Sequence, residues 1–406
     1  MKFNKNIILF VAVMLFILSG FTLRYFQDLK YQVLSFLVQN EDAAEDVSSL
    51  LDRIDNMSTD YLRYHDEMMH LDSLKQRLTN NRIIVKDDDT VVRTDSDSLV
   101  LLQSAPFSET EVDGIVDNIT RLQKHAKANN AEFLYIAAPS KSVTLDLPEN
   151  VTDYGKDNFS TFLNGLEKNN VPTLNLCRVL EEENRLDSSL FFKTDHHWLP
   201  DVGFWATGEI CRELNERYGF EYNTQYTDLS NYDITVHENI FLGSVGKKVG
   251  LWYTSEGAED FSVITPEFKT DFTSRRPHKN VEQTGSFEDV LLNMKHVAHV
   301  DYFNMNPYAT YSGGDYRLQI LSNNRNVEGK KILIVRDSFA NVVTPFLALH
   351  AGELHVADTR FMIPDEPLNI YDYIEQFKPD YVMLLYGGVE DPPHGYGRYD
   401  FDQTPS

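Results

Sequence analysis

Two short polar segments, far apart in the chain, carry residue types that chemistry needs. The stretch from Phe191 to Pro200 reads FFKTDHHWLP, in which an apolar run gives way to Asp195, two histidines and a tryptophan. Such a cluster fits a metal site, half of a nucleophilic triad, or a polar helix start. The second segment, from Lys331 to Phe339, reads KILIVRDSF and places a serine directly after an apolar run.

Ser338 lies where a predicted strand meets a predicted helix. The run before it is typical of a buried strand, and NVVTPFLALHAG after it predicts a helix closed by Gly352. A serine at a helix N-terminus is surrounded by free N–H groups and a dipole that favour an oxyanion. Serine is also a common helix cap, so this segment alone leaves a nucleophile and a structural cap both open.

The Asp-His-His segment supplies what a serine nucleophile needs. Asp195 and His197 are separated by one residue, so a short turn can present both side chains to one site. A carboxylate that orients an imidazole, which in turn accepts a serine proton, is the logic of a catalytic triad. The two segments together predict a triad of Ser338, His197 and Asp195. Trp198 is expected to pack beside the imidazole and exclude water.

The elements that must position these residues alternate between strand and helix. Ser108 and Glu111 form a capping box that predicts a helix ending near Asn129. The runs AEFLYIAAP, VPTLNLC, KKILIVRDSF, ELHVADTRF and YVMLLYGG predict five buried strands with helical segments between them. The pattern predicts a three-layer α/β fold with a mostly parallel sheet. Ligands bind beyond the carboxyl ends of such strands, which makes Lys141 and Tyr386 further candidates for substrate binding.

Three parts are predicted along the chain. Residues 1–25 read as a signal anchor, residues 26–99 as an acidic helical stalk, and residues 100–406 as the catalytic domain. Within that domain, residues from about 220 to 328 break the alternation with short polar and aromatic segments. This stretch predicts an inserted lid of β-rich or irregular structure.

The N-terminal segment predicts the compartment. Lys2 and Lys5 precede an uncharged run from Ile7 to Phe21, which is the pattern of an export signal. Bulky Phe21 follows Ser19 and Gly20, so a small-x-small cleavage site is missing. We expect an uncleaved anchor with everything after residue 25 outside the cytoplasm, and a cleaved signal peptide is the alternative.

Composition excludes some functions. The net charge of −25 argues against nucleic-acid binding, which needs a basic surface. A hydrophobic content of 42% is enough for a sizeable core. Cys177 and Cys211 are the two cysteines, and they either pair outside the cell or are buried as small apolar residues.

The motifs and their order resemble those of the DHHW proteins. That family is related to the AlgX/AlgJ-type alginate O-acetyltransferases of the SGNH hydrolase-like superfamily, and it carries an Asp-x-His-Trp motif well before its serine element. This circularly permuted order is the reverse of the usual SGNH order, and TDHHW and RDSF stand in it here. The resemblance extends over residues 100–390 and includes AAPSK (137–141), FLGSVGKK (241–248), YSGGDY (311–316) and ADTRF (357–361). One departure is Arg336, where many relatives have Gly or Lys.

The resemblance implies roles for single residues. Ser338 corresponds to the nucleophile, His197 to the general base and Asp195 to the residue that orients it, with His196 as a neighbour. The Ser338 backbone N–H is expected to be one oxyanion donor. Candidates for another donor are Gly313, Gly314 and the Arg360 guanidinium; Arg360 could equally pair with Asp358.

A metal site is the competing interpretation of Asp-His-His. The DHH phosphoesterases use such a triplet with manganese, but they also need aspartates on early strands, whereas the acidic runs here precede the predicted sheet. The histidines at 237, 278, 296 and 299 show no metal-binding spacing. We therefore expect no metal and no cofactor.

The resemblance favours acetyl transfer to an extracellular polysaccharide through an acyl-Ser338. It implies a membrane-bound O-acyltransferase as the partner that donates the acyl group, with the N-terminal anchor as the tether to the membrane. A carbohydrate esterase, which passes the acyl group to water, and a non-catalytic polysaccharide-binding or assembly protein are the alternatives.

Overall fold

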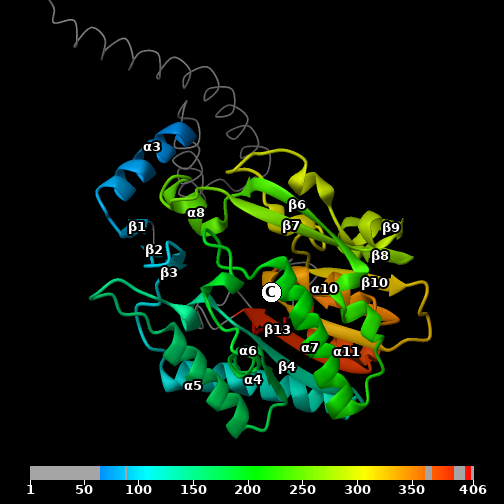
Figure 1. Ribbon diagram of the computed structural model, residues 1–406. Coiled ribbons are helices and arrows are strands. Elements are labelled where there is room, and N and C mark those ends of the chain that lie inside the picture. Colours follow the sequence, from blue (N-terminus) through cyan, green and yellow to red (C-terminus); the bar gives the residue numbers. More distant parts are fainter. Residues whose placement is uncertain (1–64, 87–88, 362–367, 388–397, 404–406) are drawn as a thin grey trace, which may run out of the picture. The chain divides into compact units, whose positions relative to one another are not determined.

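The computed structural model describes residues 65–86, 89–361, 368–387 and 398–403 (Figure 1). The chain separates into two compact units, Met1–Thr79 and Asn80–Ser406. The predicted signal anchor and most of the predicted stalk lie outside the described residues. In the first unit the structure describes helix α3, His65–Leu78. No helix within the described ranges is long and apolar enough to cross a membrane.

The second unit is built on an eight-stranded sheet with the order β5-β4-β13-β11-β12-β10-β8-β9. The five strands from β5 to β12 in this order are parallel, and β10, β8 and β9 continue the sheet in antiparallel pairing. The sheet is therefore mixed and mostly parallel, as the sequence predicts. The strands are β4 Glu132–Ala138, β5 Thr173–Asn175, β8 Phe272–Arg276, β9 Val281–Gly285, β10 Leu318–Asn323, β11 Lys331–Arg336, β12 Glu353–Ala357 and β13 Tyr381–Gly387.

Both faces of the parallel strands are buried, which explains why these strands are continuous apolar runs. Along β13, Met383 and Leu385 belong to one core and Leu384 and Tyr386 to the other. Helices α4, α5 and α11 supply the second core, and α7 and α10 supply the first (Figure 1). The helices of this α/β body are α4 Glu109–Ala128, α5 Gly155–Lys168, α6 Leu176–Glu182, α7 Pro200–Tyr218, α10 Thr344–Ala348 and α11 Ile370–Phe377.

Two helices show how the sequence sets their ends. The predicted capping box is present at α4, where the Ser108 hydroxyl accepts from the Glu111 N–H and the Glu111 carboxylate accepts from the Ser108 N–H. Helix α7 starts with Pro200 in its first turn and ends at Gly219, whose φ of 71° is left-handed. The Asp195–Trp198 segment lies directly before the start of α7.

The insertion at residues 220–328 differs from the predicted lid. Strands β8, β9 and β10 lie in this stretch, and they extend the central sheet instead of covering it, because β10 pairs with the otherwise open edge of β12. The remaining strands, β6 Tyr232–Phe241 and β7 Glu259–Pro266, form a separate two-stranded ribbon. Helices α8 Ser244–Val249 and α9 Phe287–Leu291 accompany them. A lid role for the ribbon stays a prediction.

The prediction of a helical stalk is wrong for its last residues, which form strands. Strands β1 Ile83–Lys86, β2 Asp89–Arg93 and β3 Leu99–Leu101 form a small antiparallel sheet in the second unit. The β-branched residues in this segment favour strands, and Asp97, with a φ of 63°, lies in the turn before β3. The buried side chains of this sheet share a small core with α8, formed by Val91, Leu99, Val245, Val249 and Tyr253.

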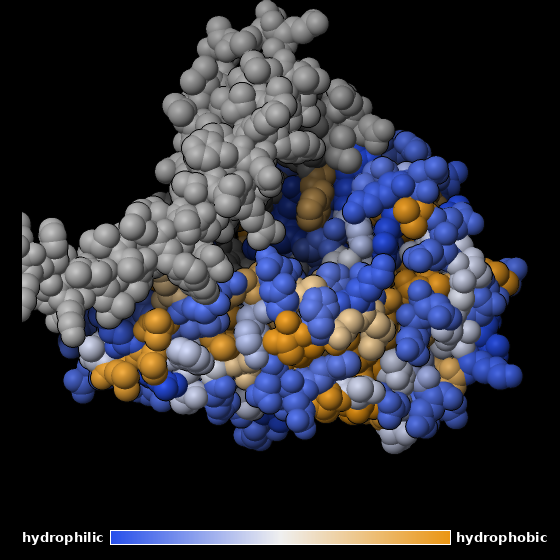
Figure 2. Space-filling view, turned by 90° about the horizontal axis from the view of Figure 1, so that it is seen from above, coloured by the Kyte–Doolittle hydropathy of each residue, from blue (hydrophilic) through white to orange (hydrophobic). Residues whose placement is uncertain are grey.

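The segment after Ser338 is not the single helix that the sequence predicts. A 3₁₀ turn covers Ser338–Val342, and α10 begins only at Thr344. Pro345 has no N–H to donate and therefore starts the new helix instead of continuing the turn. On the face seen in Figure 2, most coloured residues are hydrophilic, with hydrophobic ones between them.

Candidate active site

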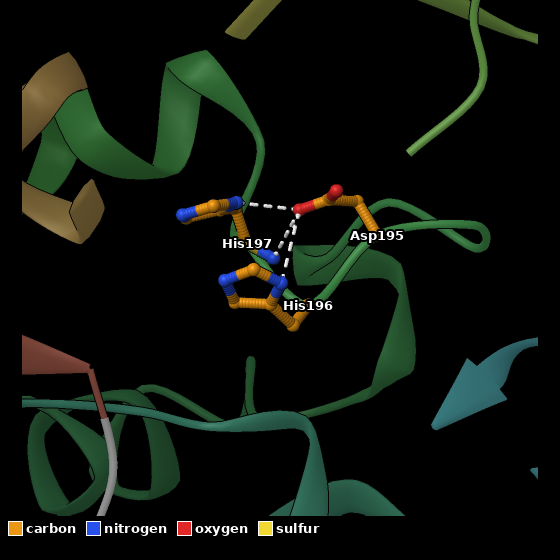
Figure 3. Close-up of side chains that lie close together, drawn as sticks. All are labelled: Asp195, His196 and His197. Carbon is orange, nitrogen blue, oxygen red and sulfur yellow. Dashed lines mark hydrogen bonds and ion pairs between the residues drawn. The ribbon is translucent and has the colours of Figure 1, made fainter. Parts of the chain in front are cut away.

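The serine and the histidine segments meet beyond the carboxyl end of the parallel sheet. Ser338 follows β11, and Asp195 and His197 lie in the turn before α7. The Nε2 atom of His197 is 2.7 Å from the Ser338 Oγ. Its Nδ1 is 2.5 Å from the Asp195 Oδ1, and Figure 3 draws this contact between His197 and Asp195. The arrangement fits a neutral imidazole that donates from Nδ1 to the carboxylate and accepts the serine hydroxyl at Nε2.

Asp195 is held as a buried carboxylate. Its side chain accepts the His197 backbone N–H at Oδ1, at 2.9 Å, and the Ser244 N–H at Oδ2, at 2.6 Å. Burial would raise the pKa of Asp195, but its electrostatic interactions with the His197 and His196 rings and the hydrogen bonds from the His197 ring and the Ser244 N–H hold that pKa well below its usual value. The carboxylate is therefore ionised and can orient the imidazole.

Lys141 supports the turn that carries Asp195 and His197, and it is not placed to bind a substrate. Its buried ammonium donates to three backbone carbonyls, those of Leu99 at 2.7 Å, Lys193 at 3.1 Å and Asp195 at 2.9 Å. An ammonium has three N–H donors, and three carbonyls take them. The predicted substrate-binding role is thus corrected to a positioning one, in which Lys141 fastens the catalytic turn to β3.

Glu259 holds the same turn from the other side. One oxygen of its carboxylate accepts the Lys193 N–H at 2.6 Å, and the other accepts the Thr194 N–H at 2.7 Å and the Thr194 hydroxyl at 2.5 Å. Burial raises the pKa of Glu259, although these hydrogen bonds act in the opposite direction. Sequence analysis misses Glu259 because an acid at the start of a strand gives no sign of what it faces.

Gly243 lets the backbone come close to Asp195. Its N–H donates to the Thr194 hydroxyl at 2.9 Å, and the next residue, Ser244, donates to the catalytic carboxylate. A Cβ atom at Gly243 would lie 2.2 Å from the Asp195 Cβ and 2.5 Å from the Thr194 carbonyl oxygen. The FLGSVGKK motif therefore contributes a close backbone contact with Asp195, which explains the glycine.

Gly243→Ala is expected to lower the turnover of a small activated ester about 100-fold, because the added methyl group pushes Asp195 off His197. The measurement is nitrophenyl acetate hydrolysis by purified, folded protein. Gly114→Ala is the matched control, since a Cβ at Gly114 meets nothing within 4 Å and the residue lies in α4. Equal activity of the two variants would contradict the close approach.

Aromatic rings surround His197, and Trp198 packs on one of them, Phe339. Tyr308 stacks on the imidazole with ring centroids 4.1 Å apart, and the Phe339 ring lies at 5.1 Å. Trp198 is fully buried and donates from its indole to the Phe339 carbonyl at 3.1 Å. It thereby ties the histidine turn to the serine turn, while Tyr308, which the sequence does not single out, covers the imidazole.

His196 is a neighbour of the triad. Its Nδ1 lies 3.0 Å from the Ser244 hydroxyl and 3.6 Å from the Asp195 carboxylate. A dashed line in Figure 3 marks the contact with Asp195. Burial and the adjacent His197 lower the pKa of His196 to about 3. A neutral ring hydrogen-bonded to Ser244 supports the position of the turn without reaching Ser338.

Asp195, His196 and His197 could also be considered as metal ligands. They are the single cluster in the described part of the chain whose ligand atoms lie close enough, within 4.8 Å of one another. Those atoms already have partners, however, since His197 Nε2 meets Ser338 and the second oxygen of Asp195 accepts from Ser244. A metal ion here would have to break the hydrogen bonds that assemble the triad, so the donor set fits a metal poorly.

Arg360 and Arg336 belong to a buried ionic cluster beside the serine turn. The Arg360 guanidinium donates to both oxygens of Asp358, at 2.9 and 2.6 Å, and to Asp315 at 3.2 Å. Arg336 has no exposed surface and pairs with Asp315 at 2.5 Å. The salt bridge named as the alternative for Arg360 is therefore present, and its guanidinium is held away from an oxyanion role.

The glycine pair forms the turn that supports this cluster. Gly313 and Gly314 have φ values of 71° and 99°, which glycine adopts at no steric cost. The Gly314 carbonyl accepts from Arg336 at 3.3 Å, and its N–H donates to the Tyr311 carbonyl at 3.3 Å. The turn thus uses the Gly314 N–H internally, which leaves it no free donor for an oxyanion. The oxyanion roles of the Gly313 and Ser338 N–H groups stay predictions.

Tyr386 lies on the wrong face of the sheet for the predicted role. Its hydroxyl donates to the Arg398 carbonyl at 2.6 Å, and its ring packs against Tyr399. Side chains alternate along a strand, so Leu385 takes the face on which Trp198 lies. Strand-end position alone does not say to which face a residue points.

Asp337 shapes the serine turn and is not identified from the sequence as a functional residue. One oxygen of its buried carboxylate accepts the Phe339 N–H at 3.0 Å, and the other accepts the Gly387 N–H at 3.1 Å. Its own N–H donates to the Leu385 carbonyl at 3.2 Å. These bonds fix the turn between β11 and β13 and set the direction of the Ser338 side chain.

The ionic cluster predicts an acid dependence of stability. Burial disfavours the charged form of Asp315, but Arg336 and Arg360 hold its pKa down to about 2, below the roughly 3.9 of an unfolded aspartate. Its contribution to stability is therefore complete above about pH 4 and is lost as the pH falls towards about 2. Urea unfolding followed from about pH 6 to about pH 2.5 measures this effect. Asp315→Asn should be less stable at pH 6 and lose less stability on acidification; an unchanged slope would contradict the coupling.

The same fold occurs in solved bacterial structures. PatB1 of Bacillus cereus, solved with a sulfonyl adduct, is 22% identical, with a TM-score of 0.61 over 79% of this chain and 100% of that chain. A DHHW family protein from Eubacterium siraeum is 18% identical, with a TM-score of 0.58 over 80% of this chain and 98% of that one. The chain has the fold of the DHHW proteins.

The DHHW fold confirms the structural side of the resemblance seen in the motifs. The O-acetyltransferase domain of Pseudomonas putida AlgJ is a more distant match, 11% identical with a TM-score of 0.45 over 75% of this chain and 92% of that domain. No protein-family model matches this chain, and no curated protein matches it.

The two cysteines do not form a disulfide. Cys177 and Cys211 are both free and buried, so of the two possibilities that the sequence leaves open, the structure shows buried apolar residues.

Proposed function

We propose that the protein is a serine-dependent O-acyltransferase that acts outside the cytoplasm and moves an acetyl group to a polysaccharide hydroxyl. The observation that carries the proposal is the unbroken hydrogen-bond chain from Asp195 through His197 to Ser338. Its distances are within hydrogen-bond reach for a base and its nucleophile. A retired site would have no need to keep a buried carboxylate, an imidazole and a hydroxyl in this order.

The first half of the reaction acylates the serine. His197 Nε2 takes the proton of Ser338 Oγ as this oxygen attacks the carbonyl carbon of the donor ester. The Ser338 N–H, at the start of the 3₁₀ turn, faces the negative oxygen of the tetrahedral state. The donor's C–O bond then breaks, and the leaving oxygen takes the proton from His197. Asp195 stabilises the imidazolium that forms between these steps.

The second half transfers the acyl group. A sugar hydroxyl attacks the acyl carbon of Ser338 while His197 takes its proton. The Ser338 ester bond breaks, and the serine oxygen recovers that proton as the acetylated sugar leaves. In a transferase a sugar hydroxyl attacks the acyl carbon, whereas in a carbohydrate esterase water does. The acceptor therefore separates this proposal from the esterase.

The partners in the proposal follow from the sequence resemblance. The acceptor is a cell-surface or secreted polysaccharide, and the acyl donor is supplied by a membrane-bound O-acyltransferase. Residues 1–25, with a basic end before an apolar run, would hold the protein at the membrane with its catalytic unit outside. A secreted form after signal cleavage is the alternative for localisation.

The test uses purified residues 26–406 with nitrophenyl acetate as donor and a defined oligosaccharide as acceptor. Mass spectrometry should find an acetyl adduct on Ser338 and acetyl groups on the oligosaccharide. An adduct on another residue would reassign the nucleophile. Acetate release without acetylated oligosaccharide would favour the esterase, and loss of activity in EDTA would favour a metal site.

A further inference from the structure

A pocket of about 360 Å³ lies at the opposite ends of the strands from Ser338. Its lining includes Asn323, at the end of β10, and His350, just before β12. Because β10 runs antiparallel to β12, the last residues of β10 and the first residues of β12 lie on the same side of the sheet, at the ends of the strands. Ser338 follows the carboxyl end of β11, which is parallel to β12. The triad therefore lies beyond the carboxyl ends of the parallel strands, and this pocket lies at their amino ends.

A second hollow borders the pocket. That hollow has a volume of about 590 Å³ and shares Phe268, Lys269, Thr270 and Arg325 with the first. Each volume lies within the range of pockets that bind small molecules. The shared lining makes the two hollows neighbours, and we call them together the β10 groove, defined by Tyr222, Tyr226, Phe268, Lys269, Arg325 and His350.

Aromatic rings form one wall of the β10 groove. Tyr226 and Phe268 stack with centroids 4.7 Å apart at an angle of 18°, and both are only partly buried. The rings of Tyr222 and Tyr226 flank His350 at 5.9 and 5.6 Å. Tyr226 and Phe268 cover each other on their stacked sides, so the outer side of this pair and the Tyr222 ring, with the two tyrosine hydroxyl groups, are what a ligand with an apolar face and a polar rim can meet, which is the character of a pyranose ring.

His350 is a second and independent sign of a ligand. It lines the groove with 5% of its surface exposed, and neither ring nitrogen has a hydrogen-bond partner among the described residues. Burial lowers the pKa of His350 to about 4, so the neutral ring offers one donor and one acceptor. Buried polar groups are rarely left unsatisfied in proteins. A hydroxyl group can both donate and accept, as the ring requires, and because both nitrogens are themselves buried it reaches them only when Tyr222 or Tyr226 turns aside.

The charges of the groove favour a neutral ligand over an ionic one. Lys269 and Arg325 are exposed, and neither forms an ion pair with an acid in the described ranges. Glu221, Asp271 and Glu288 line the same groove, so both signs are present. Side chains of mixed charge provide donors and acceptors for hydroxyls, whereas an anionic sugar would meet the acids and a cationic one the bases.

We propose that the β10 groove is a second saccharide-binding site, which holds a neutral stretch of polysaccharide away from Ser338. The proposal does not depend on the transfer reaction, because the groove and the triad share no residue. A polymer held there would remain attached while other parts of it visit the triad.

The experiment measures binding of two neutral probes, cellohexaose and the hexamer of N-acetylglucosamine, to residues 26–406 by calorimetry and saturation-transfer NMR. At least one probe should bind. Tyr226→Ala and Arg325→Ala should each weaken binding about tenfold, because each removes a contact from the groove. Arg121→Ala is the matched control, since Arg121 is an exposed arginine on α4 outside the groove.

Further measurements separate this proposal from the proposed function. Ser338→Ala should bind the probe as the parent protein does, and the groove variants should hydrolyse nitrophenyl acetate at the parent rate, which also shows that they are folded. The proposal is wrong if neither probe binds, if both groove variants bind normally, or if Ser338→Ala removes binding. Tighter binding of oligogalacturonate than of the neutral probes would also overturn the choice of a neutral ligand.

Discussion

Ser338→Ala is expected to lower the hydrolysis of nitrophenyl acetate by about 10⁴-fold or more. The hydroxyl oxygen is the atom that forms the acyl bond, and His197 Nε2, 2.7 Å away, has no other proton to accept from this turn. The alanine side chain leaves the Asp337 hydrogen bonds unchanged, so the turn itself should persist. Steady-state kinetics together with mass spectrometry of the acyl adduct measures both consequences.

A control separates loss of the nucleophile from loss of the fold. Ser160→Ala makes the same chemical change on the exposed surface of α5, and should keep the parent rate. Phenylmethanesulfonyl fluoride should label the parent protein and the Ser160→Ala variant but not the Ser338→Ala variant. Activity that survives Ser338→Ala in a folded protein would remove the triad from consideration.

Asp195→Asn is expected to cost about 10⁴-fold in kcat with little change in the fold. The Ser244 N–H could still donate to the amide oxygen, but the amide nitrogen would donate to His197 Nδ1 and place the ring proton on Nε2. That tautomer donates to Ser338 and cannot accept its proton. The variant also lacks the negative charge that stabilises the imidazolium. Kinetics, with circular dichroism as the check on folding, measures the effect.

The two histidines distinguish a triad from a metal site. His197→Asn should fall to about the level of Asp195→Asn, because the base is gone, whereas His196→Asn should lose much less activity. His196 touches Ser244 and Asp195, so some loss from a shifted turn is expected. Equal and complete losses for both histidines, with rescue by a divalent metal, would instead support a metal centre.

The sequence predicts the parts of the fold in which local pattern and burial agree. Strand β13 is apolar on both faces because both faces are covered, and its run YVMLLYGG shows this directly. The capping box of α4 is a local device of four residues, and the structure has it in full. The pairing of Asp195 with His197 also depends on a spacing of two residues, which a single turn satisfies.

The remaining features depend on what a residue meets far along the chain. Lys141 reads as a strand-end polar residue, and only its three carbonyl partners, one of them 54 residues away, show that it holds the turn. Glu259 lies 65 residues from the Thr194 that it holds. Strand β10 pairs with β12 outside the 220–328 segment and with β8 much earlier in that segment, so neither partner is its neighbour in sequence. Such long-range partners leave no periodic pattern to read.

The carbonyl of Leu99 sets where an active fragment of this protein can begin. It accepts one of the three N–H groups of the buried Lys141, and the Leu99 N–H donates to the Lys193 carbonyl at 2.7 Å. A truncation starting at residue 102 would remove both bonds and leave a buried ammonium short of an acceptor. The smallest unit that can be trimmed, fused or displayed without loosening its catalytic turn therefore starts before β1, close to Asn80.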